Sequence, residues 1–309
     1  MIFLERGKIL TESITKIARR DDIQALRGFA VISVLLFHFN KDIFSFGYLG
    51  VDVFFVISGF VISNLIYSEI TNNTFSFKSF FSKRFKRIIP ALLSYGIFVQ
   101  IIIYFVLDHR QIIETSKTLM YSLGFLSNIH LSRYLPYFDS GSEYNLVVNL
   151  WSLSVEEQFY IIFPLLAMLI YKLNRALILP FFLLLFFISL SLAHIYSKSE
   201  NDAFITHGSF FLFPTRAWEL LLGSILFLAH SNNWIKINDI NVNNLMSFFG
   251  LVLICYSIIF FSEATPFPSI YTLIPTIGTA LLITFCRKGT LINKILTVKP
   301  MILIGLISY

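Results

Sequence analysis

Charge is scarce in this sequence. Only 14 % of its 309 residues are charged, whereas an ordinary soluble domain carries roughly 25 % charged residues. Hydrophobic residues make up 56 %, and the mean hydropathy is +0.74. A soluble globule of this size cannot hide so many apolar side chains from water. The composition therefore excludes a water-soluble enzyme and a disordered chain, and it predicts an all-α, polytopic helical membrane protein.

Cysteine is also scarce. The chain has two cysteines, Cys255 and Cys286, and both lie in apolar runs. They provide neither a disulfide framework nor a set of metal ligands, so we expect inert thiols and no metal site. The net charge of +6 would suit nucleic acid, but basic cytoplasmic loops explain it better in a membrane protein. No nucleic-acid partner is expected.

The apolar runs predict about 8–10 transmembrane helices. The predicted spans lie near Gly28–Asn40, Val51–Tyr67, Ile88–Leu107, Gln158–Tyr171, Ala176–Tyr196, Phe210–Ala229, Leu245–Phe261, Tyr271–Cys286 and from Met301 onward. Residues 1–22 form a cytoplasmic N-terminal segment in this interpretation, and residues 23–309 form one transmembrane domain.

The stretch Thr118–Leu131 is short and only moderately apolar, so it is either a re-entrant helix or a span. If it does not cross, 18 of the 24 Lys and Arg residues lie in segments on the side of the N-terminus. If it does cross, that bias weakens sharply. The positive-inside rule therefore predicts a non-crossing element and a cytoplasmic N-terminus.

Ionisable residues inside spans are costly and usually functional. Arg27 and His38 are 11 residues apart in the first span, so they share one helix face about 16 Å apart. His38 is a candidate general base; the alternative is a histidine hydrogen-bonded inside a polar bundle core. Asp52 opens the second span and would orient His38, pair with an arginine or complement the helix dipole.

The run FFSKRFKRIIP places Arg84 and Arg87 on one side of a helix. They would either anchor the protein on anionic lipid or bind the phosphates of a cytosolic cofactor. Arg216 and Glu219 lie three residues apart in an apolar span, which predicts a buried ion pair.

The segment NLWSLSVEEQFYIIFP is the densest polar cluster. Ser154 and Glu157 fit a capping box at a helix start, which would give Glu157 a structural role. Glu156 has no such role, and it lies one turn before Tyr160.

Six segments together resemble membrane acyltransferase family 3, whose members O-acylate cell-envelope glycans. These segments occur in the family's order and are LRGFAVISVLLFH, GYLGVDVFFVISGFVI, FFSKRFKRIIPAL, WSLSVEEQFYIIFPLL, FPTRAWELLLG and PTIGTALLI. The resemblance implies that His38 is central to acyl transfer with Arg27, and that Arg84 and Arg87 engage the acyl-CoA.

This chain departs from the family pattern at two places. Asn149 stands where the family often has a histidine before the Trp-Ser-Leu motif that begins at Trp151, so Asn149 is expected to bind a sugar without transferring a proton. Family members usually continue beyond the sequence that ends here at Tyr309, so we expect a domain that is incomplete at its C-terminal end.

The resemblance implies an integral O-acyltransferase of the bacterial cytoplasmic membrane that moves acetyl from cytosolic acetyl-CoA to a sugar hydroxyl. The expected catalytic residues are His38, Arg27, Asp52 and Glu156, with Trp151, Ser154, Glu157, Arg216, Glu219 and Asn149 in structural or substrate-binding roles. The acceptor would be O-antigen, capsule, another exopolysaccharide or peptidoglycan.

The expected partners are membrane lipid, the acyl-CoA, the glycan, and a second copy or a separate periplasmic acyltransferase. The alternatives are a transporter or translocator of a lipid-linked glycan, whose discontinuous helices would also bury such charges, and an inactive truncated member of the family.

Overall fold

The computed structural model describes residues 20–40, 43–44, 46–133, 145–198, 208–235, 239–262 and 265–308. Over these ranges the chain is helical and contains no β-strand, which confirms the all-α prediction. Seven helices in this part of the chain are long and apolar enough to cross a membrane, and Ile270–Phe285 is a shorter apolar helix. Most of the predicted cytoplasmic segment 1–22 lies outside the described residues.

The helices follow the predicted spans in order. They are α2 (Asp21–Phe39), α3 (Leu49–Thr71), α4 (Phe77–Val106), α5 (His109–Leu123), α6 (Ser127–Leu131), α7 (Leu150–Leu173), η2 (Arg175–Leu177), α8 (Ile178–Tyr196), α10 (Phe213–Ser231), α11 (Ile240–Phe260), η3 (Ile270–Thr272), α12 (Leu273–Phe285), α13 (Leu291–Leu296) and α14 (Lys299–Ile307).

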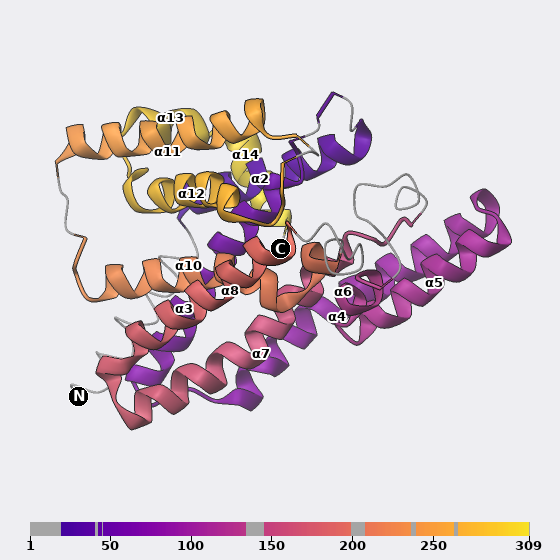
Figure 1. Cartoon of the computed structure of the whole chain (residues 1–309), viewed down its shortest axis with the longest axis horizontal. Helices are drawn as coiled ribbons and strands as arrows, with labels where there is room; N and C mark the ends of the chain where they lie inside the picture. The colour runs from indigo at the N-terminus through magenta and orange to yellow at the C-terminus, as the bar shows by residue number, and fades with distance from the viewer. Residues whose placement is uncertain are drawn as a thin grey trace.

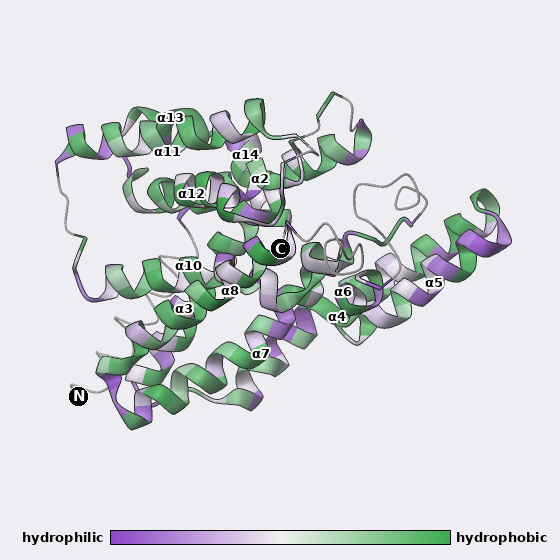
Figure 2. Cartoon of the chain, viewed as in Figure 1, coloured by the Kyte–Doolittle hydropathy of each residue, from purple (hydrophilic) through white to green (hydrophobic). Residues whose placement is uncertain are grey.

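Helix α3 is the centre of the bundle, and it contacts α2, α7, α10 and α12. In Figure 1, α2 and α11 to α14 lie on one side of α3, and the hairpin of α4 and α5 projects from the other. The hydrophobic residues in Figure 2 run along most helices, whereas α5 carries a distinct polar face. The apolar side chains exposed on α4 and α11 suit contact with lipid.

Glycines allow the closest helix crossings. A Cβ atom added at Gly59 of α3 would collide with the backbone carbonyl of Leu220 in α10, and one added at Gly223 of α10 would collide with that of Val56. Helices in membranes associate largely through such close packing of backbones. The same arrangement holds α14 against α2, where Gly28 and Gly305 face the partner backbone.

After α5 and α6 the chain comes back to the middle of α5. The side-chain amide of Asn145 donates to the hydroxyl of Thr118 at 2.8 Å, so the chain comes back to the same place on α5. Between these residues, Phe125 stacks on Phe85 of α4, deeper along that helix. That Thr118–Leu131 does not cross the membrane stays a prediction.

Three helices begin well before their predicted starts, and the first of them is α2, which begins at Asp21 rather than Gly28. Helix α4 begins at Phe77 rather than Ile88, so Arg84 and Arg87 lie inside the helix. Helix α7 begins at Leu150 rather than Gln158, with Asn149 at its N-cap position.

The predicted capping box at Ser154 and Glu157 is therefore wrong, because both residues lie inside α7. The hydroxyl of Ser154 donates to the carbonyl of Leu150 and lies 2.7 Å from that of Ser127. The helix starts early because burial of Trp151 against Phe210, with ring centroids 4.9 Å apart, stabilises the additional turn.

Candidate active site

A cavity of about 310 Å³ lies where α2, α3, α4 and α7 meet. Its polar lining includes Arg27, Ser58, Arg87 and Glu156, and its walls include Leu92 and Leu153. We call it the Glu156 cavity. Four helices far apart in sequence thus bring five of the predicted site residues to one hollow, which Arg84 and Glu157 also line.

A second cavity of about 420 Å³ adjoins the first. It is lined by Gln24, Asn64, Glu69 and Lys83, and we call it the basic cavity. The residues common to both cavities are three arginines, Arg27, Arg84 and Arg87. Positive charge therefore lies at the passage between the two hollows, which suits an anionic ligand.

Arg84 is held from two sides. Its Nε and Nη2 atoms donate to Oε1 of Glu157 at 3.3 Å and 2.9 Å, and both side chains are nearly buried. Its guanidinium carbon lies 3.6 Å from the ring centre of Tyr160, a close cation–π contact. Because one edge of the guanidinium already binds Glu157, that edge cannot also grip a phosphate.

Arg27 and Arg87 differ from Arg84 in their surroundings. Arg27 is buried on α2, where its Nη1 lies 3.4 Å from the side-chain oxygen of Gln24. Arg87 is exposed, although it lines both cavities. Of the two predicted phosphate-binding residues, Arg87 is thus the one whose side chain is more accessible.

Glu156 sits at the centre of a small hydrogen-bond network. The hydroxyl of Ser58 donates to its Oε1 at 3.0 Å, and the hydroxyl of Tyr160 donates to its Oε2 at 3.2 Å. The carboxyl group is therefore held by α3 and by its own helix α7. Ser58 and Tyr160 were not predicted as site residues. In the sequence, only the position of Tyr160 one helical turn after Glu156 could have indicated this network.

His38 lies at the other end of α2 from Arg27. Its side chain is exposed in the last helical turn, and its ring meets that of Phe37 edge-on at 5.3 Å. Eleven residues of helix separate it from Arg27 by about 16 Å along the axis. His38 is not among the residues that line the two cavities.

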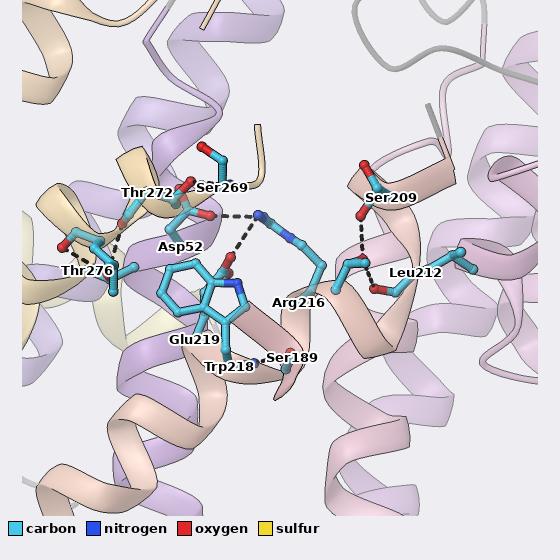
Figure 3. Close-up of polar contacts among 12 residues, drawn as sticks. Asp52, Ser189, Ser209, Leu212, Arg216, Trp218, Glu219, Ser269, Thr272 and Thr276 are labelled. Atoms are coloured by element: carbon cyan, nitrogen blue, oxygen red, sulfur yellow. Dashed lines mark hydrogen bonds and ion pairs between the residues drawn. The ribbon is translucent and has the colours of Figure 1, made fainter. Parts of the chain in front are cut away.

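The structure shows one of the alternatives for Asp52, because its carboxylate pairs with an arginine. Oδ1 of Asp52 accepts from Nη2 of Arg216 at 2.9 Å, while Nη1 of Arg216 donates to Oε1 of Glu219 at 2.8 Å. All three side chains are fully buried. The predicted pair of Arg216 and Glu219 is confirmed, and Figure 3 shows Asp52 completing it from α3.

The remaining predicted residues hold the scaffold around these groups. Trp151 is buried, and its ring centre lies 5.4 Å from the guanidinium carbon of Arg216. Asn149 is exposed at the start of α7, where its backbone carbonyl accepts from Ser152. No cluster of three or more His, Cys, Asp or Glu residues that could hold a metal occurs in the described part of the chain.

Comparison with known proteins identifies the family of the chain. The sequence model of a family described as "Acyltransferase domain" matches residues 20–309. No solved structure matches the chain.

Three relatives illustrate the similarity. An uncharacterized protein of Haemophilus influenzae is 35 % identical over 236 residues, which are 75 % of this chain and 96 % of that protein. A putative peptidoglycan O-acetyltransferase of Bacillus subtilis is 30 % identical over 305 residues, 93 % of this chain and 46 % of that protein. A peptidoglycan O-acetyltransferase of Listeria monocytogenes is 31 % identical over 301 residues, 93 % of this chain and 47 % of that protein.

The chain spans about half the length of these two named O-acetyltransferases. The match nevertheless covers nearly all of the membrane bundle described above. From its family match and its apolar helices, we conclude that this chain is a multi-pass membrane protein of the acyltransferase family.

Proposed function

We propose that the chain is an O-acetyltransferase that takes acetyl from cytosolic acetyl-CoA and passes it to a hydroxyl of a cell-envelope glycan. The observation that carries the proposal is the set of three arginines shared by two adjoining cavities inside the bundle. CoA carries several phosphates, and guanidinium groups are the side chains best suited to bind them. The two named relatives support acetyl as the transferred group and a glycan as its acceptor.

The proposed donor enters through the basic cavity. That cavity includes Lys83 and Glu69, which lie where α3 ends and α4 begins. We place this end of the bundle in the cytoplasm of a bacterium, in accordance with the basic segments of the sequence. Arg87 and Arg27 then bind phosphate, while Glu157 keeps Arg84 in place as a fixed positive charge.

The acyl transfer itself is assigned to His38. In the direct route, His38 takes the proton of the acceptor hydroxyl, the hydroxyl oxygen bonds to the thioester carbon, and the carbon–sulfur bond breaks. The proton then passes to the CoA thiolate, which leaves as the free thiol. In the covalent route, an imidazole nitrogen of His38 bonds to the thioester carbon, the carbon–sulfur bond breaks and the CoA thiolate leaves. The acceptor hydroxyl then attacks the acetyl group, the carbon–nitrogen bond breaks to release the imidazole, and the hydroxyl proton passes to the thiolate.

Both routes need the acyl group to cover the length of α2 between Arg27 and His38. The Glu156 cavity extends in that direction. On α4 its lining includes Tyr95 as well as Arg84, 11 residues apart, which is the same spacing as on α2. Glu156 and Ser58 provide the polar groups along this path.

The test uses membranes that contain the full chain, acetyl-CoA labelled in its acetyl group, and the purified envelope glycan of the same cells. We expect label on the glycan with the wild type and with Glu114→Gln, a control at an exposed ion pair. We expect none with His38→Ala, although that variant still folds. Transfer by His38→Ala at the wild-type rate would remove His38 from the mechanism.

A second result would reject the reaction as a whole. If well-folded wild type neither transfers label nor binds CoA, the transport alternative takes precedence. Direct binding of unlabelled CoA to the purified chain separates a missing donor site from a missing acceptor.

A further inference from the structure

The charges of the cluster formed by Asp52, Arg216 and Glu219 do not cancel. Two carboxylates face one guanidinium, and each of the three side chains has an exposed fraction of 0 %. With both acids ionised the cluster would carry a net charge of −1 inside the bundle. An uncompensated charge buried inside a membrane bundle costs several kcal/mol. A second cation or a proton must therefore neutralise the extra carboxylate.

The hydrogen bonds in the cluster are incomplete in a specific way. Arg216 donates through Nη2 to Oδ1 of Asp52 and through Nη1 to Oε1 of Glu219. The other carboxyl oxygens, Oδ2 of Asp52 and Oε2 of Glu219, are buried and have no donor. The two carboxyl groups lie side by side, because they bind the two terminal nitrogens of one guanidinium group.

The surroundings supply no further cation among the described residues that contact Arg216. Four aromatic rings surround its guanidinium carbon at 5.0–5.4 Å, from Phe55, Trp151, Phe210 and Phe267. One more titratable side chain, Tyr48, packs edge-on against Phe267 at 4.8 Å.

The nearby hydroxyl groups do not fill the gap either. Figure 3 shows Ser269, Thr272 and Thr276 beside Asp52. The hydroxyls of Ser269 and Thr276 donate to the backbone carbonyls of Pro266 and Thr272. The hydroxyl oxygen of Thr272 accepts from the backbone N–H of Ser269.

We infer that Asp52 and Glu219 bind one proton between them, so that this cluster is a proton-binding site that joins α3 to α10. A single proton turns one carboxylate into a donor and completes a hydrogen bond to the other acid. It also brings the net charge of the cluster to zero. Two acids held this close cannot both ionise easily, which is the arrangement that stabilises a shared proton.

The site is separate from the proposed acyl-transfer path. None of Asp52, Arg216 and Glu219 lines the Glu156 cavity or the basic cavity. The bound proton therefore stabilises the crossing of α3 and α10, and the stabilisation is lost as the pH rises far enough to remove it.

Infrared spectroscopy tests the inference directly. The full-length wild type in lipid nanodiscs should show, at neutral pH, a carbonyl stretching band of a protonated carboxylic acid. Asp52→Asn and Glu219→Gln should each lose that band, because the remaining carboxylate pairs with Arg216 and stays ionised. Glu114→Gln is the matched control at an exposed acid and should keep the band.

A stability measurement gives a second readout. The wild type should lose thermal stability at alkaline pH, whereas both single variants should lose this part of the pH dependence because an amide replaces the proton. The inference is overturned if neither single variant removes a protonated-acid band from a folded sample. It is also overturned if each variant keeps the full alkaline sensitivity of the wild type.

Discussion

The ion pair between Arg84 and Glu157 joins α4 to α7 at the wall of the Glu156 cavity, and its removal should lower the free energy of unfolding measurably. The two side chains are 9 % and 2 % exposed. Glu157→Leu removes the acid but leaves the arginine buried. Breaking a buried ion pair from one side costs about 3–5 kcal/mol. Because Arg84 retains its contact with the ring of Tyr160 at 3.6 Å, we expect the lower end, about 3 kcal/mol.

A double variant separates the charge from the packing. Arg84→Met together with Glu157→Leu replaces the pair by apolar side chains of similar volume. Such replacements are often close to neutral for stability, so the double variant should unfold at a higher denaturant level than Glu157→Leu alone. Transferase activity should not return with it, because the guanidinium group that lines both cavities is gone.

Reversible unfolding in mixed detergent micelles measures the free energy of unfolding for each variant. The matched control is Glu114→Leu, which breaks the exposed pair with Lys117 and should cost less than about 1 kcal/mol. A cost below about 1 kcal/mol for Glu157→Leu would refute the reasoning, because it would mean that the arginine reaches water or another anion once Glu157 is gone.

Three further predictions concern packing, donor binding and pH. Gly59→Ala should destabilise the crossing of α3 and α10 by about 1–3 kcal/mol in the same unfolding assay. The control Gly124→Ala should cost far less, because its added Cβ meets its nearest atom at 3.6 Å. Equal costs for the two variants would contradict the close approach of the helix backbones at Gly59. Arg87→Gln should raise the KM for acetyl-CoA about 10–100-fold by removing one charge-assisted hydrogen bond. Lys86 lines neither cavity, so the control Lys86→Gln should leave this KM unchanged. Burial lowers the pKa of His130 from its ordinary value, so near neutral pH the folded state binds fewer protons than the unfolded state. The free energy of unfolding should therefore fall as the pH drops below about 6.5. His130→Asn should flatten this acid dependence of the unfolding midpoint.

The sequence was sufficient to predict most helices, because a bilayer forces long apolar runs into helices. It was not sufficient to predict where α4 begins. The residues from Lys83 to Arg87 interrupt the apolar run with four basic side chains, yet α4 extends through them, and Arg84 is paired there with Glu157, 73 residues later in the chain. Hydropathy measures each side chain alone and cannot register such a distant partner.

The same limit applies to the site residues. The spacing of three residues was enough to predict the pair of Arg216 and Glu219, since neighbours on one helix turn are set by local geometry. The third member, Asp52, lies 164 residues earlier in the chain, and only the packing of α3 on α10 brings it there. The convergence of Arg27 with Arg84 on one passage likewise depends on how four helices meet.

The contact between Thr118 and Asn145 brings the chain back beside α5 before α7 begins. A segment that leaves the bundle and returns to it at the same depth crosses the membrane either not at all or an even number of times. Helices α4 and α7 must then run in opposite directions, as the contacts of Arg84 with Glu157 and of Tyr95 with Leu146 require. The sidedness of every later loop is therefore independent of how deeply α5 dips, and the chain can vary the length of that excursion without inverting anything that follows it.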